Sequence, residues 1–96
     1  MKGELLEKRE KIKSQIQNMR EKDILDLLKK AFTFKEEPQI VFFTKEETKI
    51  TGYLEINNKL LFFEIWYSTI DNNMTITIEN VWKKIKYEEE VEKNGN

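Results

Sequence analysis

The sequence predicts an α+β fold, in which an N-terminal helix or helix pair is followed by a roughly four-stranded antiparallel meander. The stretch from Glu4 to Phe32 contains neither glycine nor proline and is dominated by strong helix formers. After Pro38 the sequence changes to short apolar runs separated by turn residues, which is typical of strands. Because a run of helix precedes a run of strands, the pattern favours an antiparallel sheet over a parallel one.

The length of 96 residues corresponds to one domain, which we expect to span residues 1–87, with helix at 4–33 and strands at 39–87. Residues 88–96 are charged and end in glycine and asparagine, so we expect a disordered tail there. No apolar run approaches the roughly 20 residues that span a bilayer. The acidic N-terminus does not fit a signal peptide either. We therefore expect a cytoplasmic protein, in the cytoplasm of the host if the protein is viral.

The helical region carries a narrow apolar stripe with spacings of seven, four and three residues, formed by Leu5, Ile12, Ile16 and Met19. A seam between two helices requires such a stripe, so the stripe is a candidate surface for a homodimer. Asn18, with Glu21 three residues later, is a candidate cap for a second helix. The region is therefore either one helix kinked near Asn18 or two helices.

A tight hairpin is predicted at Asn57-Asn58, because asparagine tolerates positive φ better than most residues. Counting outward from this turn defines one face that is aliphatic or Phe throughout, and we expect that face to be the core. Its members are Ile50, Leu54, Ile56, Leu61, Phe63 and Ile65. Further along, Met74 to Trp82 alternates apolar and polar residues like a half-buried strand, and Lys83 to Tyr87 extends it.

The opposite face of this hairpin combines one leucine, three aromatic residues and one acid: Leu60, Tyr53, Phe62, Trp66 and Glu64. A helix covers only one face of so small a sheet, and an exposed aromatic patch is unusual on a monomer. Either the N-terminal helix or a second copy closes this face, or another protein docks on it, or its rings stack nucleic-acid bases. Glu64 disfavours base stacking, because its carboxylate repels phosphate.

Catalytic chemistry has few candidate side chains, because the chain contains no cysteine and no histidine. The commonest metal ligand, the usual general base near neutral pH and the usual partner of a nucleophilic serine are therefore missing. Glu64 is the best single carboxylate, and a structural role explains it more simply than an acid–base role. We expect a protein that is not an enzyme and that has no catalytic residues, metal site or cofactor.

The segment from Trp82 to Tyr87 concentrates basic and aromatic residues. In one interpretation, Lys83, Lys84, Lys86 and Tyr87 contact a phosphate backbone and stack a base. In the other, Trp82 and Ile85 anchor an edge strand and the lysines keep it soluble. The net charge of −1 disfavours a non-specific nucleic-acid binder, which usually has a basic excess. Nucleic-acid binding is therefore the alternative hypothesis.

A set of residues in the C-terminal half resembles a known family: Asn58, Leu61, Phe63, Glu64, Ile65, Tyr67, Asp71 and Trp82-Lys83-Lys84-Ile85. This pattern resembles the C-terminal half of small anti-CRISPR proteins of archaeal viruses that are directed against type I-D effector complexes. The resemblance implies a dimeric, non-enzymatic inhibitor that binds the Cas10-like large subunit of the interference complex. It also implies that acidic surface residues meet the basic DNA-handling surface of that partner.

The leading hypothesis from the sequence is therefore a small homodimeric inhibitor or adaptor that works through protein–protein contact. Its interaction candidates are the aromatic face and the N-terminal stripe.

Overall fold

The structure is a computed structural model that describes residues 2–71, 73–79 and 84–90. Two helices, α1 (Lys2–Asn18) and α2 (Glu21–Ala31), come first. Five strands follow within the described residues: β1 (Gln39–Lys45), β2 (Lys49–Ile56), β3 (Lys59–Tyr67), β4 (Asn73–Glu79) and β5 (Lys84–Glu90). They form one sheet in the order β1-β2-β3-β4-β5, and each pairs antiparallel to the next. The predicted α+β fold with an antiparallel meander is confirmed.

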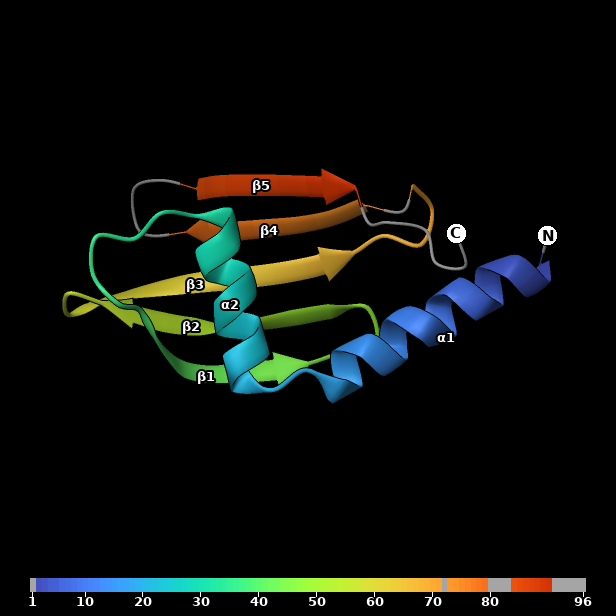
Figure 1. Cartoon of the computed structure of the whole chain (residues 1–96), viewed down its shortest axis with the longest axis horizontal. Helices are drawn as coiled ribbons and strands as arrows, with labels where there is room; N and C mark the ends of the chain where they lie inside the picture. Colours follow the sequence, from blue (N-terminus) through green and yellow to red (C-terminus); the bar gives the residue numbers. More distant parts are fainter. Residues whose placement is uncertain (1, 72, 80–83, 91–96) are drawn as a thin grey trace.

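Helix α2 lies across one face of the sheet, whereas α1 extends beyond one end of it (Figure 1). Ile24 and Leu28 of α2 are fully buried, Leu27 and Ala31 pack against the core, and charged residues occupy the exposed side of that helix. At the surface, Lys29 forms an ion pair of 2.9 Å with Glu37. Because α2 covers only one face, the described elements leave the other face of the sheet open.

The core lies between α2 and the covered face of the sheet. Its sheet members are Ile50, Leu54, Phe63, Ile65, Tyr67, Met74, Ile76 and Ile78, all buried. The predicted core face is therefore confirmed, with Ile56 and Leu61 half-buried at its margin. The hairpin turn is confirmed as well, since Asn57 and Asn58 have φ values of 51° and 65°, and Ile56 pairs with Lys59.

Three residues of the N-terminal apolar stripe, Ile12, Ile16 and Met19, pack within the chain. Ile12 and Ile16 are 8% and 0% exposed and belong to the core, and Met19 packs against it. On the exposed side of α1, Arg9 forms an ion pair of 2.9 Å with Glu47, which lies between β1 and β2. Ile12 and Ile16 are thus buried in the core of their own chain and are not exposed for a seam with a second copy. This corrects the prediction of a dimer surface from the spacing of the stripe. The side chain of Leu5 lies outside the described part of the chain.

Two helices, and not one kinked helix, make up the helical region, because α1 ends at Asn18 and α2 begins at Glu21. The predicted cap of α2 is wrong. Arg20 occupies the N-cap position with an extended backbone, and its amide N–H donates to Asp23 Oδ2 at 2.9 Å. The carboxylate three residues into the helix therefore accepts from the amide of the N-cap residue Arg20, whereas the sequence predicted that Asn18 would cap the helix with its own side chain.

Strand β5 differs from the prediction in two ways. It folds back on β4 as a separate strand, although the sequence predicted that Lys83 to Tyr87 would extend the preceding one. It also includes residues 88–90, which the sequence assigned to a disordered tail. Glu89 is held there by the Tyr87 hydroxyl, which donates to it at 2.5 Å, and by Lys30 Nζ of α2 at 3.3 Å. Residues 80–83 and 91–96 lie outside the described residues.

The burial of Tyr67 predicts that the stability of the fold decreases at alkaline pH. It is 6% exposed, and its burial, with a smaller contribution from the charge of Glu89, raises its pKa from 10.0 to about 12. A folded-state pKa above the unfolded value favours the neutral phenol in the fold. The resulting stabilisation is complete below pH 10 and is lost as the pH rises toward 12.

We expect wild type to lose about 2 kcal/mol of unfolding free energy across this interval through Tyr67, a loss that Tyr67→Phe removes. Urea unfolding of both proteins at several pH values measures the difference, in which the other titrating groups cancel. Parallel pH profiles for the two proteins would contradict the assignment.

Candidate functional site

The face of the sheet opposite α2, called the open face below, brings the sequence-predicted candidates together. Tyr53 of β2 pairs with Phe62 of β3, and Glu64 and Trp66 follow along β3 on the same side. The fully buried Phe63 and Ile65 alternate with them and point to the core. The open face has two parts of different chemistry, one near the Asn57-Asn58 turn and one at the other end of the strands.

The part near the turn is an apolar patch that consists of Val41, Phe42, Tyr53, Leu60 and Phe62. Four of these side chains are between 41% and 59% exposed, and Phe62 is half-buried. Phe42, Tyr53 and Phe62 lie next to one another across three strands. The rings of Tyr53 and Phe62 meet edge to face, with centroids 5.5 Å apart. The patch is therefore continuous over β1, β2 and β3.

Sequence reasoning missed Val41 and Phe42, because it assigned no faces within the apolar run of β1. The pairing of β1 with β2 shifts between Ile40 and Phe42, as a β-bulge does. This irregularity leaves two consecutive apolar side chains, Val41 and Phe42, exposed. A bulge depends on the partner strand, so the sequence of β1 alone does not signal it.

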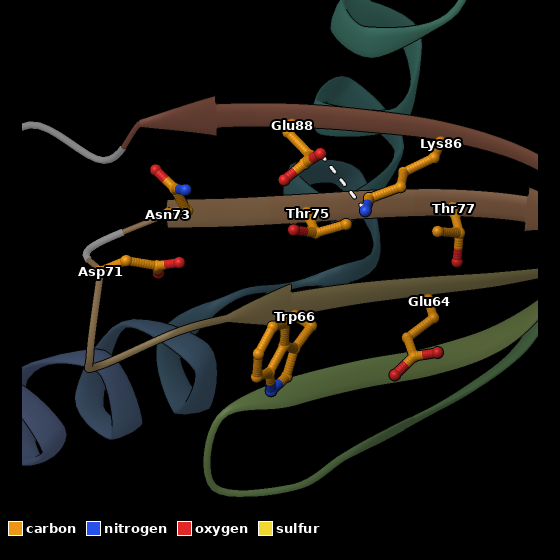
Figure 2. Close-up of a pocket in the computed structure, with 8 residues that line it drawn as sticks. All are labelled: Glu64, Trp66, Asp71, Asn73, Thr75, Thr77, Lys86 and Glu88. Atoms are coloured by element: carbon orange, nitrogen blue, oxygen red, sulfur yellow. Dashed lines mark ion pairs between the residues drawn. The ribbon is translucent and has the colours of Figure 1, made fainter.

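The other part of the open face is a groove of about 260 Å³ over strands β3, β4 and β5 (Figure 2). Glu64 and Trp66 of β3 form one side, and Lys86 and Glu88 of β5 form the other. The floor is polar and comes from β4, with Asn73, Thr75 and Thr77. Asp71, from the connection between β3 and β4, closes one end. This region is called the polar groove below.

Charges of both signs meet in the polar groove. Lys86 Nζ lies 3.3 Å from Glu88 Oε2, and Lys49 Nζ lies 3.9 Å from Glu64 Oε2. Asp71 makes no ion pair with any other residue that the structure describes. The sequence signalled only Glu64, Trp66 and Lys86 of this set, because the groove requires β5 as a separate strand beside β4.

The basic and aromatic segment does not form one surface. Lys86 lies on the open face, whereas Tyr87 points to the side of α2, where its ring packs edge to face on Phe32 at 6.3 Å. The hydrogen bond to Glu89, more than burial, raises the pKa of Tyr87. The bonds from Tyr87 and Lys30 lower the pKa of Glu89. Tyr87 is therefore not placed to stack a base beside Lys86, which corrects that part of the nucleic-acid hypothesis.

Two further candidates of that hypothesis lie outside what the structure describes, namely Lys83 and the side chain of Lys84. Among the described residues, no group of three or more acidic side chains is arranged to hold a metal ion. Neither of the helices in the described ranges is long and apolar enough to cross a membrane.

The fold and the open face define an α+β protein whose five-stranded antiparallel sheet has a helix on one side only. The chain is 43% identical over 63 residues to Uncharacterized protein 81 of Sulfolobus islandicus rod-shaped virus 1. The alignment covers 66% of this chain and 76% of the viral protein. The chain therefore belongs to the family of this viral protein. No protein-family model matches the chain, and no solved structure matches it.

Proposed function

We propose that this protein is a non-enzymatic viral inhibitor or adaptor that binds another protein through its open face. The apolar patch is the observation that carries the proposal. Contiguous exposed apolar surface is unfavourable in water and marks interaction sites. Tyr and Phe are also enriched where interfaces are buried. The patch lies on a face that no described helix covers, so it is accessible to a partner.

The partner that we propose is the Cas10-like large subunit of a host type I-D interference complex, which would make the protein an anti-CRISPR acting in the host cytoplasm. Membership in a viral protein family supports a viral origin. The resemblance of the β2–β3 hairpin and the basic segment to the anti-CRISPR family supports the choice of target. The expected mechanism is steric blocking of the subunit, which requires no catalytic group.

A binding measurement with purified components tests this function. The protein is titrated into the nuclease-treated type I-D complex and, separately, into its large subunit, and heat and stoichiometry are recorded. We expect saturable binding to both. Absence of binding to either would overturn the proposed target. Light scattering of the free protein tests the expected homodimer, and dissociation of a dimer by Phe62→Ala would assign the patch to a second copy.

The open face makes a specific prediction for this assay. We expect Phe62→Ala and Trp66→Ala each to weaken partner binding about tenfold or more, the size typical of buried aromatic anchors. Both side chains are at least partly exposed in the free protein, so both variants should remain folded. Ile70→Ala is the control, because Ile70 is 89% exposed and lies outside the patch and the groove. Unfolding of either aromatic variant would show that the open face is needed for folding.

A further inference from the structure

The polar groove contains an exposed indole between carboxylates. Figure 2 shows Trp66 with Asp71 on one side and Glu64 on the other. The Trp66 side chain is 44% exposed although it is the largest in the groove. An aromatic face of this kind attracts cations through its quadrupole, and Trp does so best.

The charges around the indole leave a negative excess. Three carboxylates belong to the groove, on Glu64, Asp71 and Glu88, whereas two ammonium groups, on Lys49 and Lys86, reach them. Each lysine is engaged with one glutamate, at 3.9 Å and 3.3 Å respectively. In the part of the chain that the structure describes, Asp71 has no cationic partner. A bound cation would provide the Asp71 carboxylate with a partner.

The floor of the groove provides a second, independent observation. Thr77 is only 8% exposed, yet its side chain lines the groove. No hydrogen bond joins its hydroxyl to any other described residue. Figure 2 shows the Thr77 side chain in the groove near Lys86 and Glu64, at the end away from Asp71. Its hydroxyl can accept a hydrogen bond from a donor on a bound cation.

We propose that the polar groove binds an arginine side chain of the protein partner, an inference that rests on the proposed function. The planar guanidinium stacks on the indole of Trp66 and donates to the Asp71 carboxylate. Arginine fits this groove better than lysine, because its guanidinium is flat, weakly hydrated and presents several donors in one plane. The apolar patch then supplies buried area, and the groove fixes the orientation of the partner.

The groove is tested first without any partner. N-acetyl-arginine amide is titrated into the isotopically labelled protein, and the indole N–H signal of Trp66 is followed, after assignment by Trp66→Phe. We expect a saturable shift with a Kd on the order of 10 mM. N-acetyl-citrulline amide has the same shape without the charge and should give no saturable shift. Equal shifts from both probes, or no saturable shift from arginine, would overturn the proposal.

Charge variants extend the same titration. We expect Asp71→Asn to weaken the arginine probe about fivefold or more, since it removes the free carboxylate and keeps the shape. Asp26→Asn is the matched control, because Asp26 lies exposed on α2, on the other side of the sheet. An unchanged Kd for Asp71→Asn would overturn the assignment of the carboxylate.

The complex separates this inference from the proposed function. If the large subunit binds, Asp71→Asn should weaken that binding several-fold and Asp26→Asn should not. Binding that is indifferent to both Asp71→Asn and Trp66→Ala would overturn the arginine site while the inhibitor function stands. If the subunit does not bind but the arginine probe still shifts Trp66, the proposed target fails and the chemistry of the groove is supported.

Discussion

Replacement of Phe63 with alanine is expected to lower the unfolding free energy by about 3–5 kcal/mol, the range for removing a buried aromatic ring. Phe63 lies at the centre of the sheet on β3, is 0% exposed, and pairs with Gly52 on one side and Ile78 on the other. Phe63 belongs to the same buried cluster as Ile16, Ile24 and Leu28, so removal of its ring leaves a cavity in the core that the surroundings fill only in part. The total unfolding free energy of a small domain is only about 5–15 kcal/mol, so the variant is close to unfolding.

The neighbouring residue provides the control for this prediction. Phe62 has the same side chain one position earlier, but it lies on the open face, where its ring meets that of Tyr53. Phe62→Ala should therefore lower the unfolding free energy by only about 1 kcal/mol, the contribution of one aromatic pair. Urea denaturation of both variants measures the difference. Similar losses in the two variants would contradict the assignment of the two faces.

The contrast between these two residues follows from the sequence alone, because a strand alternates its side chains between two faces. The Asn57-Asn58 turn fixes the register of β2 and β3, so their core and open faces could be predicted. Tyr53, Phe62, Glu64 and Trp66 could be placed on one surface for the same reason.

The remaining parts of the open face depend on tertiary structure. The stretch from Glu79 to Lys84 contains no glycine or proline that would signal a turn, so β4 and β5 were predicted as one strand. The polar groove, which needs both strands side by side, could not be foreseen for that reason. The stripe of α1 was ambiguous in another way, since its spacing shows that Ile12 and Ile16 need a covering surface but not which surface covers them.

Gly52 connects the irregular edge of the sheet with the apolar patch. It pairs with Phe43 of β1, beside the bulge that exposes Val41 and Phe42. A Cβ atom at this position would overlap the carbonyl oxygen of Phe42 and lie 2.8 Å from Phe43 Cα. Both neighbours are backbone atoms, which cannot turn away as a flexible side chain can. Glycine is therefore required where β1 approaches β2 this closely.

We expect Gly52→Val to destabilise the protein by about 3 kcal/mol, at the upper end of the range for overpacking, because β1 must move to admit the side chain. The displaced strand carries Val41 and Phe42 away from Tyr53, so the variant should also lose partner binding. Urea denaturation measures the stability, and hydrogen exchange of the β1 amides shows whether this strand has separated.

Gly3 offers the matched control, since a Cβ atom there would meet nothing within 4 Å. Gly3 lies in α1, where alanine is the better helix former, so Gly3→Ala should stabilise the protein by about 0.5 kcal/mol. The two glycine replacements therefore change stability in opposite directions. Retention of full stability and binding by Gly52→Val would show that β1 does not pack on β2 at this distance, and the apolar patch would then lose its two outermost residues.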